Sequence, residues 1–153
     1  MGITILIVDD EENFRLHLEA GLTPLGYEVI GVGTLSEAKE LLNKGIGDII
    51  LLDVQLPDGY GPNLLFETAQ LPHRPPVIQI TGFPDIEIAV EVMKNGAMDF
   101  LIKPIKLDQL EKSLTRAVEM VKMQRELSMY RDSQNNKDGF VKGNSKQMER
   151  VYM

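Results

Sequence analysis

The sequence predicts an α/β fold, a five-stranded parallel sheet in the order 2-1-3-4-5 with helices on both faces. Short apolar runs alternate with longer amphipathic stretches along the chain, and this alternation is typical of β-α units around a sheet that is buried on both faces. The 153 residues, 43% of them hydrophobic, provide enough apolar material for one compact core and leave some chain for a linker or tail. The expected strands are residues 3–8, 28–32, 48–53, 77–81 and 99–102.

Each expected helix carries apolar residues three and four positions apart, the spacing that places side chains on one face of a helix. Thr34 followed by Glu37 predicts a capping box at the start of the second helix, and Asn95-Gly96 predicts the left-handed residue that ends the fourth. The core-facing stripes are expected to be Phe14, Leu18 and Leu22 in the first helix, Leu35, Ala38 and Leu42 in the second, and Ile86, Ala89 or Val90, Met93 and Ala97 in the fourth.

Some segments between these stripes are less sharply defined. Residues 64–71 form the weakest of the predicted helices, and residues 57–59 and 72–76 are expected to be loops. Ile88 and Val92 lie four residues apart and partly off the inward stripe. They either form an exposed apolar patch or broaden the buried stripe, and the spacing alone does not decide between the two.

The C-terminal stretch is expected to be helical from Leu107 to about Arg131, longer than the closing helix of such a domain requires. One stripe would serve the core, at Leu107, Leu110, Leu114, Ala117 and Val121. A second seam is displaced around the helix, at Met120, Met123, Leu127 and Tyr130. This seam is either part of an amphipathic tail or a short parallel coiled coil that joins two copies into a homodimer. Residues 132–139, rich in Ser, Asn, Lys, Asp and Gly, are expected to be a flexible connector.

Composition excludes several classes of function. There is no cysteine, so disulfides, zinc-thiolate sites and thiol catalysis are excluded. The net charge of −7 and the lack of a basic cluster lead us to expect no direct binding to nucleic acid. No apolar run approaches the roughly 20 residues that span a bilayer, and the N-terminus lacks the basic flank of a signal peptide. We therefore expect a cytoplasmic chain without a membrane span.

Three acidic residues follow expected strands. Asp9 and Asp10 come directly after the first strand, and Asp53 closes the third. The carboxyl ends of parallel strands form one edge of the sheet, where open α/β folds bind ligands. Carboxylates crowded together repel one another, so we expect a cation among them. A hard divalent ion prefers oxygen ligands, and Mg²⁺, which keeps several waters and bridges to phosphate, fits best.

Two further side chains are expected at the same edge. Thr81 ends the fourth strand and Lys103 follows the fifth. A hydroxyl and an ammonium placed there would stabilise the charge that develops on the oxygens of a phosphoryl group during its transfer. Asp53 would then be the nucleophile, because carboxylates form aspartyl phosphates in other phosphoryl-transfer proteins.

Four motifs stand in a set order along the chain: Ile-Leu-Ile-Val-Asp9-Asp10-Glu, Ile-Leu-Leu-Asp53-Val-Gln-Leu-Pro-Asp-Gly, Ile-Thr81-Gly and Phe-Leu-Ile-Lys103-Pro. Together they closely resemble the receiver domains of bacterial two-component response regulators, over about residues 3 to 125. The resemblance implies the flavodoxin-like receiver fold. It also implies a sensor histidine kinase as the partner that donates a phosphoryl group.

The resemblance implies roles for the acidic residues. Asp53 would be the phosphoacceptor. Asp10 and Asp53 would ligate Mg²⁺ directly, together with the backbone carbonyl of Gln55. Asp9 would act on the ion through a water molecule.

The resemblance also implies roles for residues on the later strands. Thr81 and Lys103 would contact the phosphoryl group. Phe100 would be the aromatic switch that changes its rotamer as Thr81 moves inward. The Lys103–Pro104 peptide bond would be cis, which proline alone makes inexpensive.

A second, shorter motif follows the expected connector, at Phe140-Val-Lys-Gly143-Asn-Ser145-Lys-Gln-Met148. It resembles the opening of the ATPase domain of sigma-54-dependent (NtrC-type) transcription activators. The resemblance implies a receiver domain over 1–122, a helical or coiled-coil linker with a flexible connector over 123–139, and the start of a truncated ATPase domain over 140–153. Phosphorylation would then alter dimerisation and control a downstream ATPase and transcription.

A metal-dependent phosphohydrolase of the haloacid dehalogenase type is the competing hypothesis. That family places its nucleophile in the first strand within Asp-x-Asp, whereas the first strand here leads into Asp-Asp-Glu. We therefore expect a signalling domain that catalyses only its own phosphorylation and dephosphorylation, not an enzyme that turns over a substrate.

Overall fold

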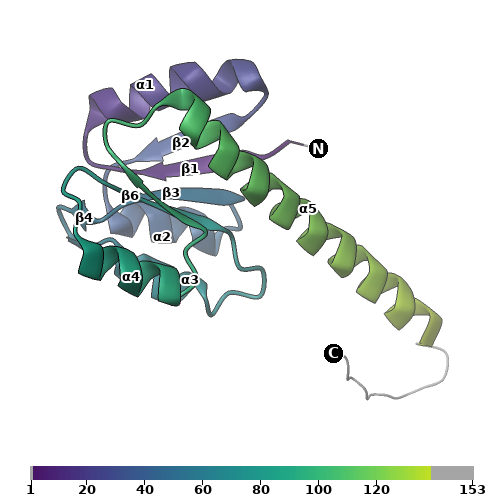
Figure 1. Cartoon of the computed structure of the whole chain (residues 1–153). Helices are drawn as coiled ribbons and strands as arrows, with labels where there is room; N and C mark the ends of the chain where they lie inside the picture. The colour runs from purple at the N-terminus through teal and green to yellow at the C-terminus, as the bar shows by residue number, and fades with distance from the viewer. Residues whose placement is uncertain (1, 139–153) are drawn as a thin grey trace. The chain divides into compact units, whose positions relative to one another are not determined.

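The computed structural model describes residues 2–138, with side chains up to residue 130. The centre of the fold is a five-stranded parallel sheet (Figure 1). The strands of this sheet are β1 (Thr4–Val8), β2 (Glu28–Val32), β3 (Ile49–Asp53), β6 (Val77–Thr81) and β7 (Asp99–Ile102). They lie in the order β2-β1-β3-β6-β7, and each neighbouring pair is parallel. The predicted order 2-1-3-4-5 is confirmed, because β4 (Gln55–Leu56) and β5 (Gly59–Tyr60) form a separate hairpin.

Helices cover both faces of the sheet (Figure 1). The helices are α1 (Glu12–Leu22), α2 (Leu35–Asn43), α3 (Pro62–Thr68), α4 (Ile86–Lys94) and α5 (Leu107–Asp138), with a short 3₁₀ helix at Thr23–Leu25. In β1, Ile5 and Ile7 belong to the core under α1 and α5, whereas Leu6 and Val8 belong to the core under α2, α3 and α4. All residues of β3 and β6 are buried. This burial on both faces explains why the strands read as nearly continuous apolar runs.

Local signals in the sequence correctly placed several turns and caps. The Thr34 hydroxyl accepts a hydrogen bond from the backbone N–H of Glu37 at 3.1 Å, and so caps α2 as predicted. Gly96 has a φ of 100°, the left-handed conformation expected after α4. The Lys103–Pro104 bond is cis, as the family resemblance implied.

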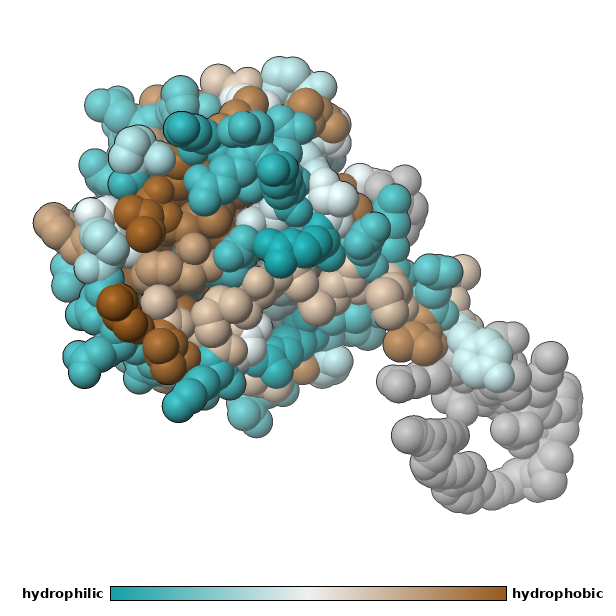
Figure 2. Space-filling view, in the orientation of Figure 1, coloured by the Kyte–Doolittle hydropathy of each residue, from teal (hydrophilic) through white to brown (hydrophobic). Residues whose placement is uncertain are grey.

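The expected inward stripe of α4 is wrong at Ile86, Val90 and Met93, although Ala97, just after the helix, is buried as predicted. Ile86, Val90 and Met93 are 82%, 48% and 46% exposed, whereas Val92 is fully buried and Ile88 packs against the core. Figure 2 shows the resulting apolar side chains over α4, at the lower left. Apolar residues occupy most of the circumference of α4, so their spacing fits two orientations of the helix equally well. Ile88 and Val92 therefore broaden the buried surface, and the exposed patch lies on the neighbouring stripe.

The helix α5 begins at Leu107 as predicted, but it differs from expectation in the burial of that residue and in where it ends. Four of the five predicted core residues are buried, namely Leu110, Leu114, Ala117 and Val121, but Leu107 at the first turn is 42% exposed. The helix continues to Asp138, so the flexible connector predicted from residue 132 is wrong over residues 132–138. Polar residues with good helix propensity, such as the Gln and Lys found there, continue a helix that has already begun.

Two smaller predictions also differ from the structure. The weakest predicted helix, at 64–71, begins and ends earlier, as α3. The loop predicted at 57–59 is the turn of the β4–β5 hairpin, and Gly59 belongs to β5.

The chain divides into two compact units, Met1–Val121 and Lys122–Met153. In the second unit, the seam residues Met123, Leu127 and Tyr130 are 62%, 50% and 63% exposed. The ATPase-like motif at 140–148 lies outside the described residues. Among the helices that the structure describes, none is both long and apolar enough to cross a membrane.

Candidate functional site

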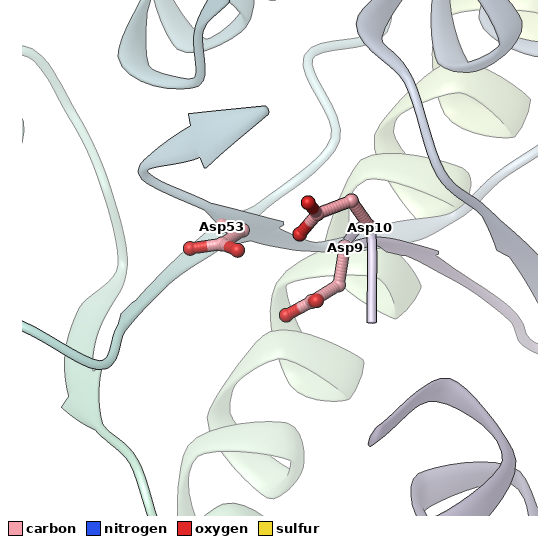
Figure 3. Close-up of side chains that lie close together, drawn as sticks. All are labelled: Asp9, Asp10 and Asp53. Atoms are coloured by element: carbon pink, nitrogen blue, oxygen red, sulfur yellow. The ribbon is translucent and has the colours of Figure 1, made fainter. Parts of the chain in front are cut away.

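Three carboxylates meet at the carboxyl edge of the sheet (Figure 3). Asp9 and Asp10 follow β1, and Asp53 is the last residue of β3. These two strands are neighbours in which Val8 pairs with Leu52, so the residues that follow each partner come together. One oxygen of each carboxylate lies within 4.8 Å of the others. Asp9 and Asp53 are buried, whereas Asp10 is exposed.

Lys103 brings positive charge to this cluster from the end of β7. Its Nζ lies 2.7 Å from Asp9 Oδ2, 2.7 Å from Glu11 Oε1 and 3.8 Å from Asp53 Oδ2. The ammonium also lies 4.2 Å from the centroid of the Phe14 ring, within range of a cation–π interaction. Burial by itself would lower the pKa of Lys103, but the contacts with Asp9 and Glu11 together outweigh it and raise the pKa. The side chain is therefore charged at neutral pH.

Asp9 connects the cluster to the elements around it. Its Oδ1 accepts a hydrogen bond from the backbone N–H of Glu11 at 2.9 Å, while its Oδ2 pairs with Lys103. The backbone carbonyl of Asp9 accepts a hydrogen bond from the Arg15 guanidinium at 2.7 Å. Arg15 reaches this position over Gly31 of β2, where an added Cβ would lie 3.0 Å from the Arg15 Cδ. The glycine thus leaves the room that Arg15 occupies.

The pKa of the Asp53 carboxyl is raised by its surroundings. Burial, and after it the charge of Asp9, raise the pKa of the Asp53 carboxyl from 3.8 to about 6. Lys103 and the backbone N–H groups of Val54 and Gln55 act in the opposite direction, but their effects are smaller. A carboxylate in these surroundings is stabilised by any cation that joins it.

A cleft of about 570 Å³ opens over the cluster, and Asp10, Asp53, Thr81, Phe83 and Lys103 are among its lining residues. Thr81 is buried, and its hydroxyl is engaged within its own loop. The hydroxyl oxygen accepts a hydrogen bond from the Phe83 N–H at 3.0 Å, and the hydroxyl donates to the Phe83 carbonyl at 3.1 Å. To donate to a group bound to Asp53, the Thr81 hydroxyl would have to give up the hydrogen bond that it donates to the Phe83 carbonyl.

The remaining residues predicted for the site lie in different surroundings. Gln55 is exposed and lines the cleft. Phe100, in β7, is half-buried and packs against the apolar core under α2, α3 and α4. Their roles as a metal ligand and as an aromatic switch stay predictions.

Two residues at the site were missed in the sequence. Glu11 stands in the Asp-Asp-Glu motif, but no local pattern indicates that its carboxylate pairs with Lys103, which is 92 positions away. Gly61 was not singled out, although its N–H donates to the Val54 carbonyl at 2.6 Å and an added Cβ would lie 1.8 Å from the Asp53 carbonyl oxygen. The sequence signal that could have drawn attention to Gly61 is its position directly before Pro62, the residue that begins α3.

The donor set of the cluster fits a hard divalent cation. The three groups offer carboxylate oxygens, which Mg²⁺ prefers, and the exposure of Asp10 leaves room for the waters that Mg²⁺ retains. Oδ2 of Asp9 is buried, and the Lys103 ammonium that balances its charge at 2.7 Å is shared with Glu11. Further positive charge would therefore stabilise the cluster.

Comparison with known proteins agrees with this geometry. Residues 5–115 match the family described as response regulator receiver domain. The chain is 36% identical over 147 residues to the luminescence regulatory protein LuxO of Vibrio campbellii, which covers 95% of this chain and 32% of that protein. It is 35% identical over 123 residues to the regulatory protein AtoC of Escherichia coli, which covers 80% of this chain and 27% of that protein.

A solved structure shares the fold. The crystal structure of NtrX from Brucella abortus in complex with ADP is similar with a TM-score of 0.74 at 35% identity, over 84% of this chain and 30% of that one. The chain thus spans about a third of the length of the curated relatives it matches.

Proposed function

The chain belongs to the response regulator receiver domain family, and on that premise we propose that it is a phosphorylation-controlled switch with Asp53 as its phosphoacceptor. A receiver domain is a signalling domain and not a classical enzyme. The observation that carries the proposal is the meeting of Asp9, Asp10 and Asp53 with Lys103 at one edge of the sheet. This arrangement supplies a nucleophile, oxygen ligands for a cation and a donor for phosphoryl oxygens.

In the proposed reaction, a carboxylate oxygen of Asp53 attacks the phosphorus atom of a phosphohistidine on a sensor histidine kinase. The new O–P bond forms as the P–N bond breaks and the imidazole leaves. Lys103 donates to the phosphoryl oxygens, because its ammonium already lies 3.8 Å from Asp53 Oδ2. Thr81 turns from Phe83 to donate to the same group.

Asp10, Asp53 and the backbone carbonyl of Gln55 would hold Mg²⁺, with Asp9 acting through a water. The bound ion would neutralise charge on the phosphoryl oxygens, as it does in other phosphoryl-transfer sites. Without it, the three carboxylates would repel an anionic donor.

The output of the switch would be a change at the face formed by α4, β7 and α5. Phe100 would change its rotamer as Thr81 moves inward. The exposed apolar stripe of α4, at Ile86, Val90 and Met93, belongs to this face. Phosphorylation adds negative charge and acceptor oxygens at one place, and small movements there would favour one of two arrangements of this face.

In the whole protein, this chain would be the N-terminal receiver of a sigma-54-dependent activator of the NtrC type. Two observations support this placement: the motif at 140–148, and the match to about a third of the length of relatives that are named as regulatory proteins. We propose domain limits of 1–122 for the receiver, 123–139 for the linker and 140–153 for the start of the ATPase domain. The protein would act in the cytoplasm, with phosphorylation altering dimerisation and thereby ATPase and transcription output.

Incubation of the chain with acetyl phosphate and Mg²⁺ tests the proposed function. We expect intact-mass spectrometry to show the gain of a single phosphoryl group located on Asp53. We expect EDTA to abolish the gain, because the carboxylates then repel the donor. Sustained turnover of p-nitrophenyl phosphate without a stable gain on Asp53 would identify a phosphohydrolase and overturn the proposal.

The seam on α5 provides a test of dimerisation. We expect the double substitution Leu127→Gln and Tyr130→Gln to weaken self-association at least about tenfold, because each buried apolar side chain contributes about 1.5–3 kcal/mol. Sedimentation velocity over a range of concentrations measures the effect. Lys122→Gln, which changes an exposed residue outside the seam, is the control and should leave association unchanged. A wild-type chain that is monomeric at all concentrations, with and without beryllium fluoride, would contradict the coiled coil.

A further inference from the structure

Glu11 is an acidic residue at the edge of the site for which the proposed reaction has no use. It occupies the N-cap position of α1, but its side chain makes no capping hydrogen bond. Its carboxylate instead accepts a hydrogen bond from Lys103 Nζ at 2.7 Å. The Glu11 carboxylate thus interacts with the lysine of the site and not with its own helix.

The ammonium of Lys103 lies nearer to Glu11 than to the phosphoacceptor. The distance from Nζ to Glu11 is 2.7 Å, and the distance to Asp53 is 3.8 Å, which is too long for a hydrogen bond. Glu11 is not required to keep Lys103 at the site, because Asp9 at 2.7 Å and the ring of Phe14 at 4.2 Å also hold the ammonium. Glu11 therefore occupies one of the N–H donors of the Lys103 ammonium, but it is not needed to hold the lysine side chain at the site.

We propose that Glu11 is a positioning residue that tethers Lys103 in the unphosphorylated state, so that an incoming phosphoryl group must compete with Glu11 for the ammonium. This inference rests on the proposed function of Asp53 as phosphoacceptor. In it, Glu11 sets how readily the site accepts a phosphoryl group, without touching the reacting atoms.

The tether has the strength that a reversible switch requires. The Glu11 side chain is 64% exposed, whereas that of Asp9 is 2% exposed. An exposed ion pair is screened by water and salt and changes an equilibrium by about fivefold at most. A phosphoryl group carries about −1.5 to −2 charges and several acceptor oxygens, so it outcompetes a single exposed carboxylate. The pair with Asp9, which is buried, remains.

Two substitutions of Glu11 separate the effect of its charge from the effect of its side-chain length. Glu11→Gln removes the charge, and Glu11→Asp keeps the charge but withdraws the carboxylate by one methylene. Glu12→Gln, which removes the same charge from the next residue of the chain, is the matched control. The readouts are the rate of intact-mass gain with acetyl phosphate and Mg²⁺ and the midpoint of a beryllium fluoride titration, which needs no chemistry on the donor.

We expect Glu11→Gln to accelerate phosphorylation about two- to fivefold and to lower the beryllium fluoride midpoint by a similar factor, since this is the range of an exposed ion pair. Glu11→Asp should also be faster than wild type, because its shorter side chain no longer reaches Lys103. Glu12→Gln should match wild type. In about 1 M salt the Debye length falls to about 3 Å, so the difference in phosphorylation rate between Glu11→Gln and wild type should shrink.

A Glu11→Gln rate equal to or below that of wild type would overturn the tether. So would a fast Glu11→Gln variant beside an unchanged Glu11→Asp variant, since charge alone would then explain the effect. A merely structural role of Glu11 would lower thermal stability without accelerating phosphorylation and without lowering the beryllium fluoride midpoint. If the wild-type chain itself takes up no phosphoryl group, the proposed function fails, and this result is distinct from every outcome that concerns Glu11.

Discussion

Asp53→Asn is expected to abolish phosphoryl uptake from acetyl phosphate while leaving the fold intact and making the metal-free chain more stable at pH 7. The amide has the shape of the carboxylate but is not a nucleophile, so the labelled mass should not appear. It also carries no charge, and the site penalises charge at this position through burial and the neighbouring Asp9. The variant should therefore gain stability as it loses function.

The pH dependence of this gain follows from the raised pKa of Asp53. Because the folded-state pKa is about 6 and the ordinary value is 3.8, the folded wild-type chain binds this proton more tightly than the unfolded chain. Its contribution to stability is fully present below about pH 4 and is lost as pH rises through about 6. Asp53→Asn lacks this loss, so its advantage should be absent near pH 4 and reach about 1–3 kcal/mol at pH 7.

Urea denaturation in EDTA at several pH values measures this difference, and circular dichroism checks the fold. Glu12→Gln, which neutralises an exposed carboxylate, should show no such gain at pH 7. Labelling of Asp53→Asn at the wild-type level would refute the assignment of the nucleophile. A difference in stability between Asp53→Asn and wild type that does not depend on pH would show that the charge of Asp53 is not its cause.

Gly61→Ala is expected to destabilise the chain by at least about 3 kcal/mol and to slow phosphorylation. The added Cβ would lie 1.8 Å from the Asp53 carbonyl oxygen and 3.0 Å from that of Val54. These are backbone atoms of the segment that carries the phosphoacceptor, so they cannot rotate away as a side chain would. The φ of −52° at Gly61 suits any residue, which means that space and not backbone conformation demands glycine here.

Urea denaturation compares this variant with Gly21→Ala, which adds the same methyl group within α1. There the added Cβ would meet only the Leu107 side chain, at 3.4 Å, and alanine favours a helix over glycine by about 1 kcal/mol, so we expect no loss of stability. Normal stability and normal phosphorylation of Gly61→Ala would show that the β3–β4 segment can shift to accept the methyl group.

Much of the fold could be predicted because its signals are local. Strands buried on both faces appear as apolar runs, and their order along the chain with helices between them implies parallel pairing. The acidic residues at the ends of β1 and β3 could be grouped for the same reason, since the carboxyl ends of parallel strands share one edge. The structure places Asp9, Asp10 and Asp53 together at that edge.

Predictions that depended on orientation were less successful. The sequence of α4 offers two apolar stripes, and only packing against the sheet selects Val92 and Ile88 over Ile86 and Val90. The end of α5 was also misjudged, because composition typical of a linker is compatible with continuation of an existing helix.

The sequence by itself determined which strands form, which edge of the sheet carries the chemistry and which residue types meet there. Only the tertiary structure decided that Lys103 lies closer to Glu11 than to Asp53, and that Gly61 has no room for a side chain beside the phosphoacceptor. The physical reason is that hydrophobic periodicity and turn chemistry act over a few residues. Contacts between side chains that are distant in the chain depend instead on how whole helices and strands pack. Shifts of a fraction of an ångström in that packing change such contacts, and no local sequence pattern encodes them.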